Sequence, residues 1–200
     1  MAENMTNNFL NVFPTLIASF DLDQIDNDVL KGKMDVAGNI NHGLLENGIS
    51  SYVGGEDCFL TRLGVQDLKK AIQYHLQEYC FHSGIAPNVI VNSWANVLHE
   101  AGYVRRHRHE KSILSGAYYP VDSDTCLVLE NPNTIFQMTQ TNVNDTIYNA
   151  DKIIIKPTKG KLVIWPSYVY HYTETNSDKP RYTVSFNTLD DSYKHAINRT

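Results

Sequence analysis

The sequence predicts a mainly β protein whose strands form a double-stranded β-helix, or jelly roll, with supporting helices. From residue 88 onward, short runs rich in Val, Ile, Tyr and Thr follow one another and are separated by turn residues. No helical pattern lies between these runs, which favours antiparallel pairing of the strands. The 200 residues are enough for one domain whose core needs no disulfide or metal to fold.

We expect one domain over residues 1–200, with a strand, loops and supporting helices in 1–87 and the jelly-roll core in 88–190. The clearest helix covers residues 64–83, where apolar side chains recur at helical spacing and Gly84 follows as a C-cap. The other elements expected before the core are a strand at 10–20, a helix at 22–34 and a Gly- and Asn-rich loop at 35–57.

The core itself is divided into strands by its turn residues. Each run is short and β-branched or aromatic in character, which is typical of strands that pack between two layers. The expected strands cover residues 88–98, 104–109, 112–119, 125–130, 134–138, 151–156, 161–165, 168–174 and 180–188.

The bulk composition argues against two classes of partner. A net charge of −5 and a pI near 5.9 disfavour binding to a nucleic-acid backbone. No apolar stretch reaches the length of a membrane span, and the first residues do not resemble a secretory signal. Three widely spaced cysteines are typical of reduced thiols. We therefore expect a cytoplasmic protein that binds neither nucleic acid nor membrane; a homodimer is compatible with these features.

Two histidines two positions apart, His107 and His109, form a candidate metal site. On a strand they would share one face, with Arg108 on the other. Paired imidazoles on an inward face can hold a divalent transition metal. Taken alone, the motif is also compatible with two surface histidines in a charged strand.

A second group of candidates lies in the C-terminal half. His171 follows a buried strand that ends at Trp165 and Pro166, and Arg181 opens the next apolar strand with Thr183 two positions later. An arginine in this place can present a fixed bidentate cation to the barrel interior. Alternatively, His171 is a core imidazole and Arg181 forms a surface salt bridge.

Five motifs in this order together resemble the 2-oxoglutarate/Fe(II) dioxygenase superfamily, and within it an uncharacterised bacterial and phage branch with an HxH motif. The resemblance covers most of the chain. The motifs are SWAN (93–96), HRH (107–109), SGAYY (115–119), GKLVIWPSYVYH (160–171) and RYTVSFN (181–187).

The resemblance implies a role for each matching residue. It implies oxidation of an unidentified substrate, a small molecule or a peptide side chain, by O2 while 2-oxoglutarate is decarboxylated to succinate. The substrate is expected to enter past the segments 35–57 and 139–150. The implied catalytic metal ligands for Fe(II) are His107, His109 and His171; Arg181 would pair with the distal carboxylate of 2-oxoglutarate, Tyr119 and Thr183 would donate hydrogen bonds to it, and Asn96 and Trp94 would line the pocket.

The chain departs from most of the superfamily in its second metal ligand. Most members carry HxD or HxE and so form a two-histidine, one-carboxylate triad. Here the position is His109, and Glu110 could replace it only if a bulge turned its side chain inward. The remaining histidines are not expected to be ligands: His42, His75, His82, His99 and His195.

Two other functions remain open at this point. A cupin-type metal enzyme without 2-oxoglutarate would have the same cupin-like barrel, and Gly160, Pro166 and His171 reproduce most of a cupin motif. A non-catalytic jelly-roll binding protein would have no use for the histidines. Arg181 distinguishes the enzyme alternatives, because a cupin needs no buried cation there.

Overall fold

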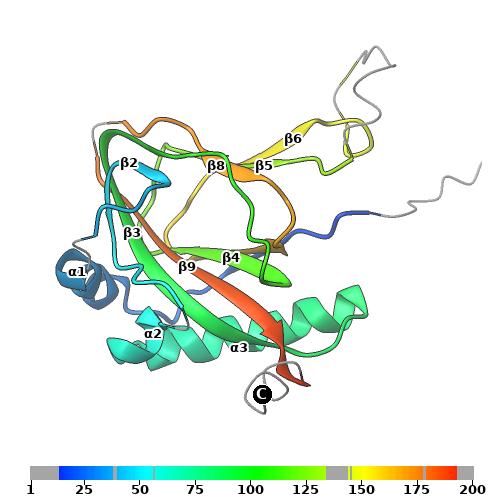
Figure 1. Ribbon diagram of the computed structural model, residues 1–200, viewed down its shortest axis with the longest axis horizontal. Coiled ribbons are helices and arrows are strands. Elements are labelled where there is room, and N and C mark those ends of the chain that lie inside the picture. Colours follow the sequence, from blue (N-terminus) through cyan, green and yellow to red (C-terminus); the bar gives the residue numbers. More distant parts are fainter. Residues whose placement is uncertain are drawn as a thin grey trace, which may run out of the picture.

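The computed structural model describes residues 14–37, 40–55, 57–133, 144, 146–177 and 179–192, which contain two antiparallel sheets (Figure 1). The strands are β1 (Ala18–Asp21), β2 (Leu45–Ser50), β3 (Asn88–Val104), β4 (Leu114–Tyr119), β5 (Leu127–Glu130), β6 (Lys152–Ile155), β7 (Lys161–Pro166), β8 (His171–Thr173) and β9 (Arg181–Asp190). The larger sheet has the order β1-β7-β4-β9-β3-β2 and the smaller sheet the order β6-β5-β8. This is the predicted jelly roll.

Three helices cover the outer face of the larger sheet: α1 (Asn27–Ala37), α2 (Phe59–Arg62) and α3 (Gln66–Ser83) (Figure 1). Strand β4 shows how the two layers share the sheet. Leu114 and Tyr118 pack into the helix-side core, whereas Ala117 and Tyr119 pack against the smaller sheet. All residues of β4 are buried, because both of its faces are covered.

Helix α3 confirms the prediction made from its apolar stripe. Leu68, Ile72 and Leu76 are fully buried against the sheet. Gly84 ends the helix with a φ of 69°, a left-handed conformation that costs glycine little. Helix α1 begins later than expected because Asp26 caps it: the Asp26 carboxylate accepts a hydrogen bond from the Val29 amide at 3.0 Å.

The N-terminal strand predictions were only partly right. Within the described residues, the strand expected at 10–20 covers only β1, which pairs with β7. The loop expected at 35–57 contains β2, which pairs with β3. Strand β2 carries Gly and Asn, and the partner strand rather than its own composition holds it extended. Both strands join the larger sheet, so the first part of the chain contributes to the jelly roll.

The strand expected at 104–109 is wrong, and this bears on the metal site. Strand β3 is one long strand that ends at Val104. Its pairing with β9 stops at Leu98, and its pairing with β2 stops at Val104. Beyond that residue the chain has no neighbouring strand, so it continues as an irregular segment with one isolated bridge, between His107 and His171.

The other core strands lie where the sequence predicts them, with ends shifted by a few residues. Every registered strand pair is antiparallel, as expected. The strand predicted at 134–138 lies outside the described residues.

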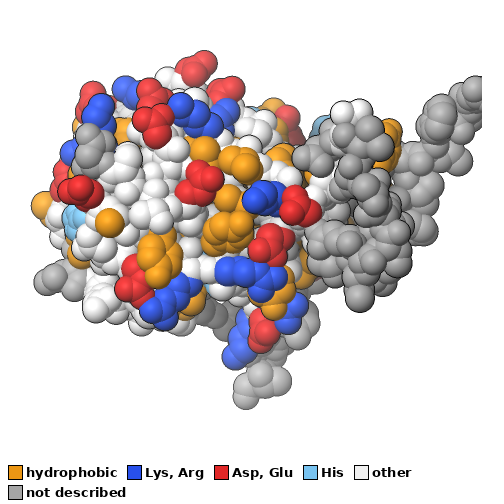
Figure 2. Space-filling view, turned by 90° about the horizontal axis from the view of Figure 1, so that it is seen from above, with side chains coloured by type: hydrophobic (Ala, Val, Ile, Leu, Met, Phe, Trp, Pro, Cys, Tyr) orange, Lys and Arg blue, Asp and Glu red, His pale blue; other side chains and the backbone are white. Residues whose placement is uncertain are grey.

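The described surface carries charges of both signs. Figure 2 shows acidic and basic side chains interspersed on the face seen from above, with hydrophobic side chains between them. No helix in the described part of the chain is long and apolar enough to cross a bilayer.

Gly116 in the SGAYY motif faces Phe186 across the β4–β9 pair, and we expect Gly116→Ala to be destabilising. A Cβ at this position would lie 2.1 Å from Phe186 Cζ, and the Phe186 ring is fully buried. Overpacking of this kind costs about 1–3 kcal/mol of unfolding free energy. Urea denaturation measures the loss.

Gly32→Ala is the matched control, because a Cβ there meets nothing within 4 Å in helix α1. It should raise the unfolding free energy by up to about 1 kcal/mol through helix propensity. Equal losses in both variants would contradict the packing explanation for Gly116.

Candidate metal centre and adjoining cavity

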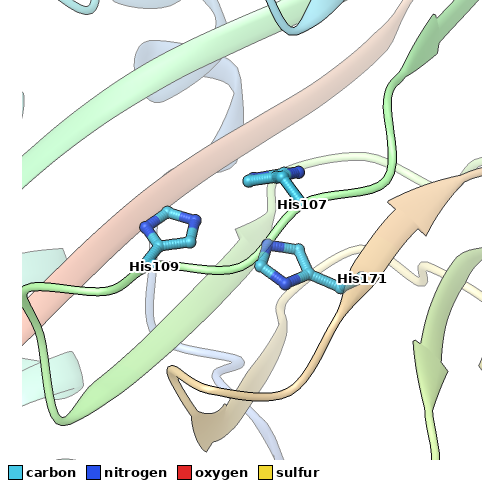
Figure 3. Close-up of side chains that lie close together, drawn as sticks. All are labelled: His107, His109 and His171. Atoms are coloured by element: carbon cyan, nitrogen blue, oxygen red, sulfur yellow. The ribbon is translucent and has the colours of Figure 1, made fainter.

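Three histidine side chains converge between the two sheets (Figure 3). His107 and His109 come from the segment between β3 and β4, and His171 is the first residue of β8. One ring nitrogen of each lies within 4.8 Å of the others. Nitrogens bound to one ion at about 2 Å lie at most about 4 Å apart, so small ring rotations complete the set.

Backbone hydrogen bonds position these histidines in place of a strand. The His107 amide donates to the His171 carbonyl at 3.0 Å, and the His171 amide donates back to His107 at 2.8 Å. The His109 amide donates to the Ser167 carbonyl at 3.0 Å. The segment therefore stays extended, and both imidazoles face the same side although no strand imposes the alternation.

Side chains on the outside of this segment hold it against the smaller sheet. Arg106 donates to both carboxylate oxygens of Glu130 at 2.6–2.9 Å, and its guanidinium lies 3.7 Å from the centroid of the Tyr170 ring. The Arg108 guanidinium lies 5.0 Å from the same ring. The basic residues around the HxH motif thus hold in place the segment that carries the candidate ligands, which is a structural use of the charge cluster.

Hydrogen bonds select the tautomer of two of the histidines. The Nδ1 of His107 lies 2.8 Å from the Arg105 carbonyl, and the Nδ1 of His171 lies 3.0 Å from the Val169 carbonyl. A carbonyl only accepts, so each Nδ1 carries the proton. Each Nε2 is left with a free lone pair, the arrangement typical of histidines that bind metals.

Burial keeps all three imidazoles neutral. It lowers the pKa of His107, lowers that of His109 to about 4, and lowers that of His171 well below its ordinary value. The neighbouring histidines lower the pKa of His109 and His171 further, because two close positive charges repel. Neutral imidazoles are the form that binds a metal ion, so the site is ready to do so near neutral pH.

The structure separates His109 from its alternative, Glu110. The Glu110 side chain is 76% exposed and lies 3.4 Å from Arg108, on the outside of the segment. His42 lines the same cavity but is not part of the three-histidine cluster. His75, His82 and His99 lie outside the cluster, and His195 lies outside the described residues.

A cavity extends from the histidines into the interior of the jelly roll. His42, Leu44 and Leu45 line it, so part of the predicted entry segment 35–57 borders the site. Residues 139–143 and 145 of the second predicted entry segment lie outside the described residues. The cavity also brings together the other residues named from the sequence: Trp94, Asn96, Tyr119, Arg181 and Thr183.

Arg181 is the buried cation of this cavity, with only 3% of its surface exposed. Its Nε donates to the Thr125 carbonyl at 3.1 Å, its Nη1 to the Thr183 hydroxyl at 2.6 Å and its Nη2 to the Tyr119 hydroxyl at 3.4 Å. Burial raises the pKa of Tyr119, so the phenol keeps its proton. A guanidinium has five N–H donors, so Arg181 can bind a further acceptor.

Arg181 has no acidic partner within the described residues, where no ion pair involves it. Burial opposes its charge and lowers its pKa. An unpaired buried charge costs several kcal/mol, and a carboxylate that meets the guanidinium fork offsets this cost. The donor set therefore fits a metal ion held by the three imidazoles, together with an organic ligand that binds this metal at one end and presents a carboxylate to Arg181 at the other.

Some cavity residues were missed in the sequence. Trp165 and Ser185 line the cavity, and Asn187 contacts His109. Ser185 and Asn187 could have been found, because they follow Arg181 and Thr183 at the period of two that puts residues on one face of a strand. His42 gave no such signal, since it lies before β2 in a segment read as loop.

Residues 92–187 match the family model described as "Putative 2OG-Fe(II) oxygenase". This part of the chain belongs to the 2-oxoglutarate/Fe(II) oxygenase family. The match includes the HxH motif, His171 and Arg181. The protein is accordingly an oxidoreductase that uses Fe(II) and 2-oxoglutarate, and the resemblance to this superfamily that the five motifs indicated is confirmed. No curated protein sequence matches the chain.

Solved structures of oxygenases share the fold. An oxidoreductase of the 2OG-Fe(II) oxygenase family from Burkholderia pseudomallei is 9% identical, with a TM-score of 0.63 over 87% of this chain and 84% of that one. A prolyl hydroxylase from Trichoplax adhaerens, in complex with a hypoxia inducible factor peptide fragment, is 11% identical, with a TM-score of 0.58 over 90% and 86%. HygX from Streptomyces hygroscopicus, with nickel and 2-oxoglutarate bound, is 8% identical, with a TM-score of 0.59 over 88% and 84%.

Asn176 holds the loop that supports Arg181, and we expect Asn176→Ala to be strongly destabilising. Its side chain donates to the carbonyls of Leu98, His99 and Lys179 at 2.8–3.2 Å and accepts from the Thr125 hydroxyl at 2.7 Å. The alanine variant leaves these groups unpaired in a buried place, which costs about 2–4 kcal/mol. Thermal and urea unfolding measure the loss.

Asn131→Ala is the control, since Asn131 is half-buried and its side chain makes only one partly buried hydrogen bond, from its amide to the Ala150 carbonyl at 2.9 Å; its oxygen accepts an exposed one from the Asn133 backbone amide at 2.9 Å. Its loss should be about 1 kcal/mol. An Asn176 variant as stable as the Asn131 variant would show that the network contributes little.

Proposed function

We propose that His107, His109 and His171 bind the Fe(II) of this oxygenase and that Arg181 binds the distal carboxylate of 2-oxoglutarate. One observation carries this assignment: three neutral imidazoles line the same cavity as a buried guanidinium that has no acidic partner among the described residues. A dicarboxylate that chelates a metal through one end satisfies both groups at once.

The hydroxyls beside Arg181 complete the carboxylate site in this proposal. Tyr119 keeps its proton and can donate it, and Thr183 presents a hydroxyl already fixed by Arg181 Nη1. Asn96 lies on the neighbouring strand, paired with Thr183. Arg181 thus meets the ligand on a wall of β3, β4 and β9, which are rigid elements of the larger sheet.

When bound, iron and 2-oxoglutarate supply an oxidant from O2, with the keto acid converted to succinate and CO2 and one oxygen atom available for the substrate. The chain's own residues orient the keto acid and exclude water from it. Ala117, Leu127 and Val163 form part of an apolar cluster between the sheets, and Leu127 and Ala117 line the cavity. A dry cavity strengthens the charge contacts made by Arg181.

The substrate is a small molecule or a peptide side chain. Related folds accept both, since the Trichoplax adhaerens prolyl hydroxylase was solved with a peptide fragment and HygX with hygromycin B. We further infer a cytoplasmic protein, because Cys58, Cys80 and Cys126 are all free thiols.

Substitution of each histidine tests the metal site. His107→Ala, His109→Ala and His171→Ala should each lower Mn(II) or Fe(II) affinity by more than roughly 100-fold, because even the hydrogen-bond partners of metal ligands contribute 10- to 100-fold. Anaerobic calorimetry measures the affinity. Glu110→Ala is the control and should bind metal like the wild type; loss of binding in Glu110→Ala but not in His109→Ala would transfer the third position to Glu110.

Arg181→Ala tests the cosubstrate site. The variant should bind 2-oxoglutarate roughly 30-fold more weakly or worse, as expected for loss of a buried charged contact, while its metal affinity stays the same. The visible absorption that appears when 2-oxoglutarate joins Fe(II) under anaerobic conditions reports the binding.

Arg181→Lys keeps the charge but loses the fork, and should fall between wild type and Arg181→Ala. Equal 2-oxoglutarate binding by wild type and Arg181→Ala would reject the role of Arg181. Absence of binding in all three proteins would favour the cupin-type alternative.

A further inference from the structure

The indole N–H of Trp165 is buried without a hydrogen-bond partner among the described residues. The residue is 3% exposed, so the group has almost no contact with bulk water. Buried donors are nearly always paired, and an unpaired one lowers stability. Such an exception in a cavity wall points to an acceptor that a ligand brings.

Trp165 lies at the metal end of the cavity. It is opposite Ser115 on β4, Ser115 is opposite Asn187 on β9, and Asn187 contacts His109. The Trp165 ring also meets the His171 ring edge-on, with centroids 5.1 Å apart.

The Arg181 end of the cavity lies at a different level of the sheet. Tyr119, which bonds Arg181, is opposite Lys161 at the start of β7. The rise of a strand puts Lys161 about 13 Å from Trp165 along β7. The Trp165 indole is therefore close to the three histidines and remote from the backbone that carries the carboxylate site.

The other tryptophan differs from Trp165 in this respect. Trp94 also lines the cavity, but its indole nitrogen lies 3.1 Å from the Asn96 side-chain amide, whose oxygen accepts the bond once the amide is oriented to satisfy its neighbours. Trp94 thus has an acceptor within the protein. Trp165 has none in the part of the chain that the structure describes, so the two indoles of the chain differ in their bonding.

We propose that the Trp165 indole N–H donates a hydrogen bond to the metal-chelating end of 2-oxoglutarate, the carboxylate next to the keto group. The inference rests on the proposed function, in which that end lies beside His171 and the distal carboxylate lies at Arg181. A charged acceptor makes the stronger bond, and the chelating carboxylate is the anionic group nearest to the indole. Trp165 is then a cosubstrate-binding residue, a role that neither the five sequence motifs nor the three-histidine cluster assigns to it.

Trp165→Phe removes the N–H and keeps an aromatic ring in the wall. Under anaerobic conditions with Mn(II), calorimetry should give a 2-oxoglutarate affinity about 10- to 100-fold below wild type, as for loss of a hydrogen bond to a charged group. Mn(II) affinity should not change, because Trp165 is not a ligand. Wild-type 2-oxoglutarate affinity in Trp165→Phe would overturn the proposal.

Two analogues assign the bond to one end of the ligand. 2-Oxopentanoate keeps the chelating end and lacks the distal carboxylate, so Trp165→Phe should weaken it by the same factor as 2-oxoglutarate. 4-Oxopentanoate keeps the keto group and the distal carboxylate and has a methyl group in place of the chelating carboxylate, so Trp165→Phe should leave its affinity unchanged. A loss of 4-oxopentanoate affinity in Trp165→Phe, with 2-oxopentanoate unaffected, would overturn the assignment to the chelating end.

Nitrogen-15 NMR of the wild type gives a second readout that does not depend on how the variant folds. With Zn(II) bound, 2-oxoglutarate should move the Trp165 indole proton downfield and slow its exchange with water, and 2-oxopentanoate should do the same. The signal is identified as the one of two indole signals that remains in Trp94→Phe. A Trp165 signal unchanged by saturating ligand means that the N–H does not bond the ligand, and overturns the proposal.

Failure of the proposed function gives a different pattern. Wild type that binds metal but not 2-oxoglutarate rejects the cosubstrate site and this inference together. If Arg181→Ala binds 2-oxoglutarate more weakly than the wild type but Trp165→Phe binds it as well as the wild type, only the inference about Trp165 is rejected.

Discussion

The paired backbone hydrogen bonds between His107 and His171 are the constraint on which the candidate site depends. Strand β3 ends at Val104, where its last neighbour ends, and the chain then has no sheet to follow. The bonds at 3.0 and 2.8 Å attach the free segment to the first residue of β8. They bring two candidate metal ligands from one part of the chain to the third, and they fix the extended backbone that turns His107 and His109 to the same side.

The sequence was sufficient for the β architecture because that part depends on local pattern. The short β-branched and aromatic runs at 112–119 and 180–188, and the apolar stripe and Gly84 of helix α3, are local features that reflect burial and turn geometry directly. The course of 104–109 depends instead on where neighbouring strands stop, which no local pattern encodes. The same holds for β2, whose strand geometry comes from β3.

The candidate site residues divide in the same way, into those that a local sequence pattern identifies and those that only tertiary packing brings to the site. Arg181 and Thr183 could be identified from the sequence because alternation along one strand puts them on one face. Both line the cavity. His107 and His109 were identified on the assumption that they lie on a strand. In the structure they lie on one side of an irregular segment with an isolated bridge. His42 and Trp165 border the site through tertiary packing, so neither could be singled out from its own neighbours in the chain.

The electrostatics of the cavity connect the two halves of the proposed site. All three candidate ligands are neutral, so they remove none of the double positive charge of a bound Fe(II), whereas a triad with a carboxylate would remove one. Arg181 adds another buried positive charge without an acidic partner among the described residues. A dianionic keto acid balances most of this charge and accepts from Arg181. At the candidate site, His109 in place of a carboxylate therefore makes the cavity more dependent on its anionic cosubstrate. The same anion would balance the charge of three neutral ligands around Fe(II) and that of an arginine with no acidic partner among the described residues.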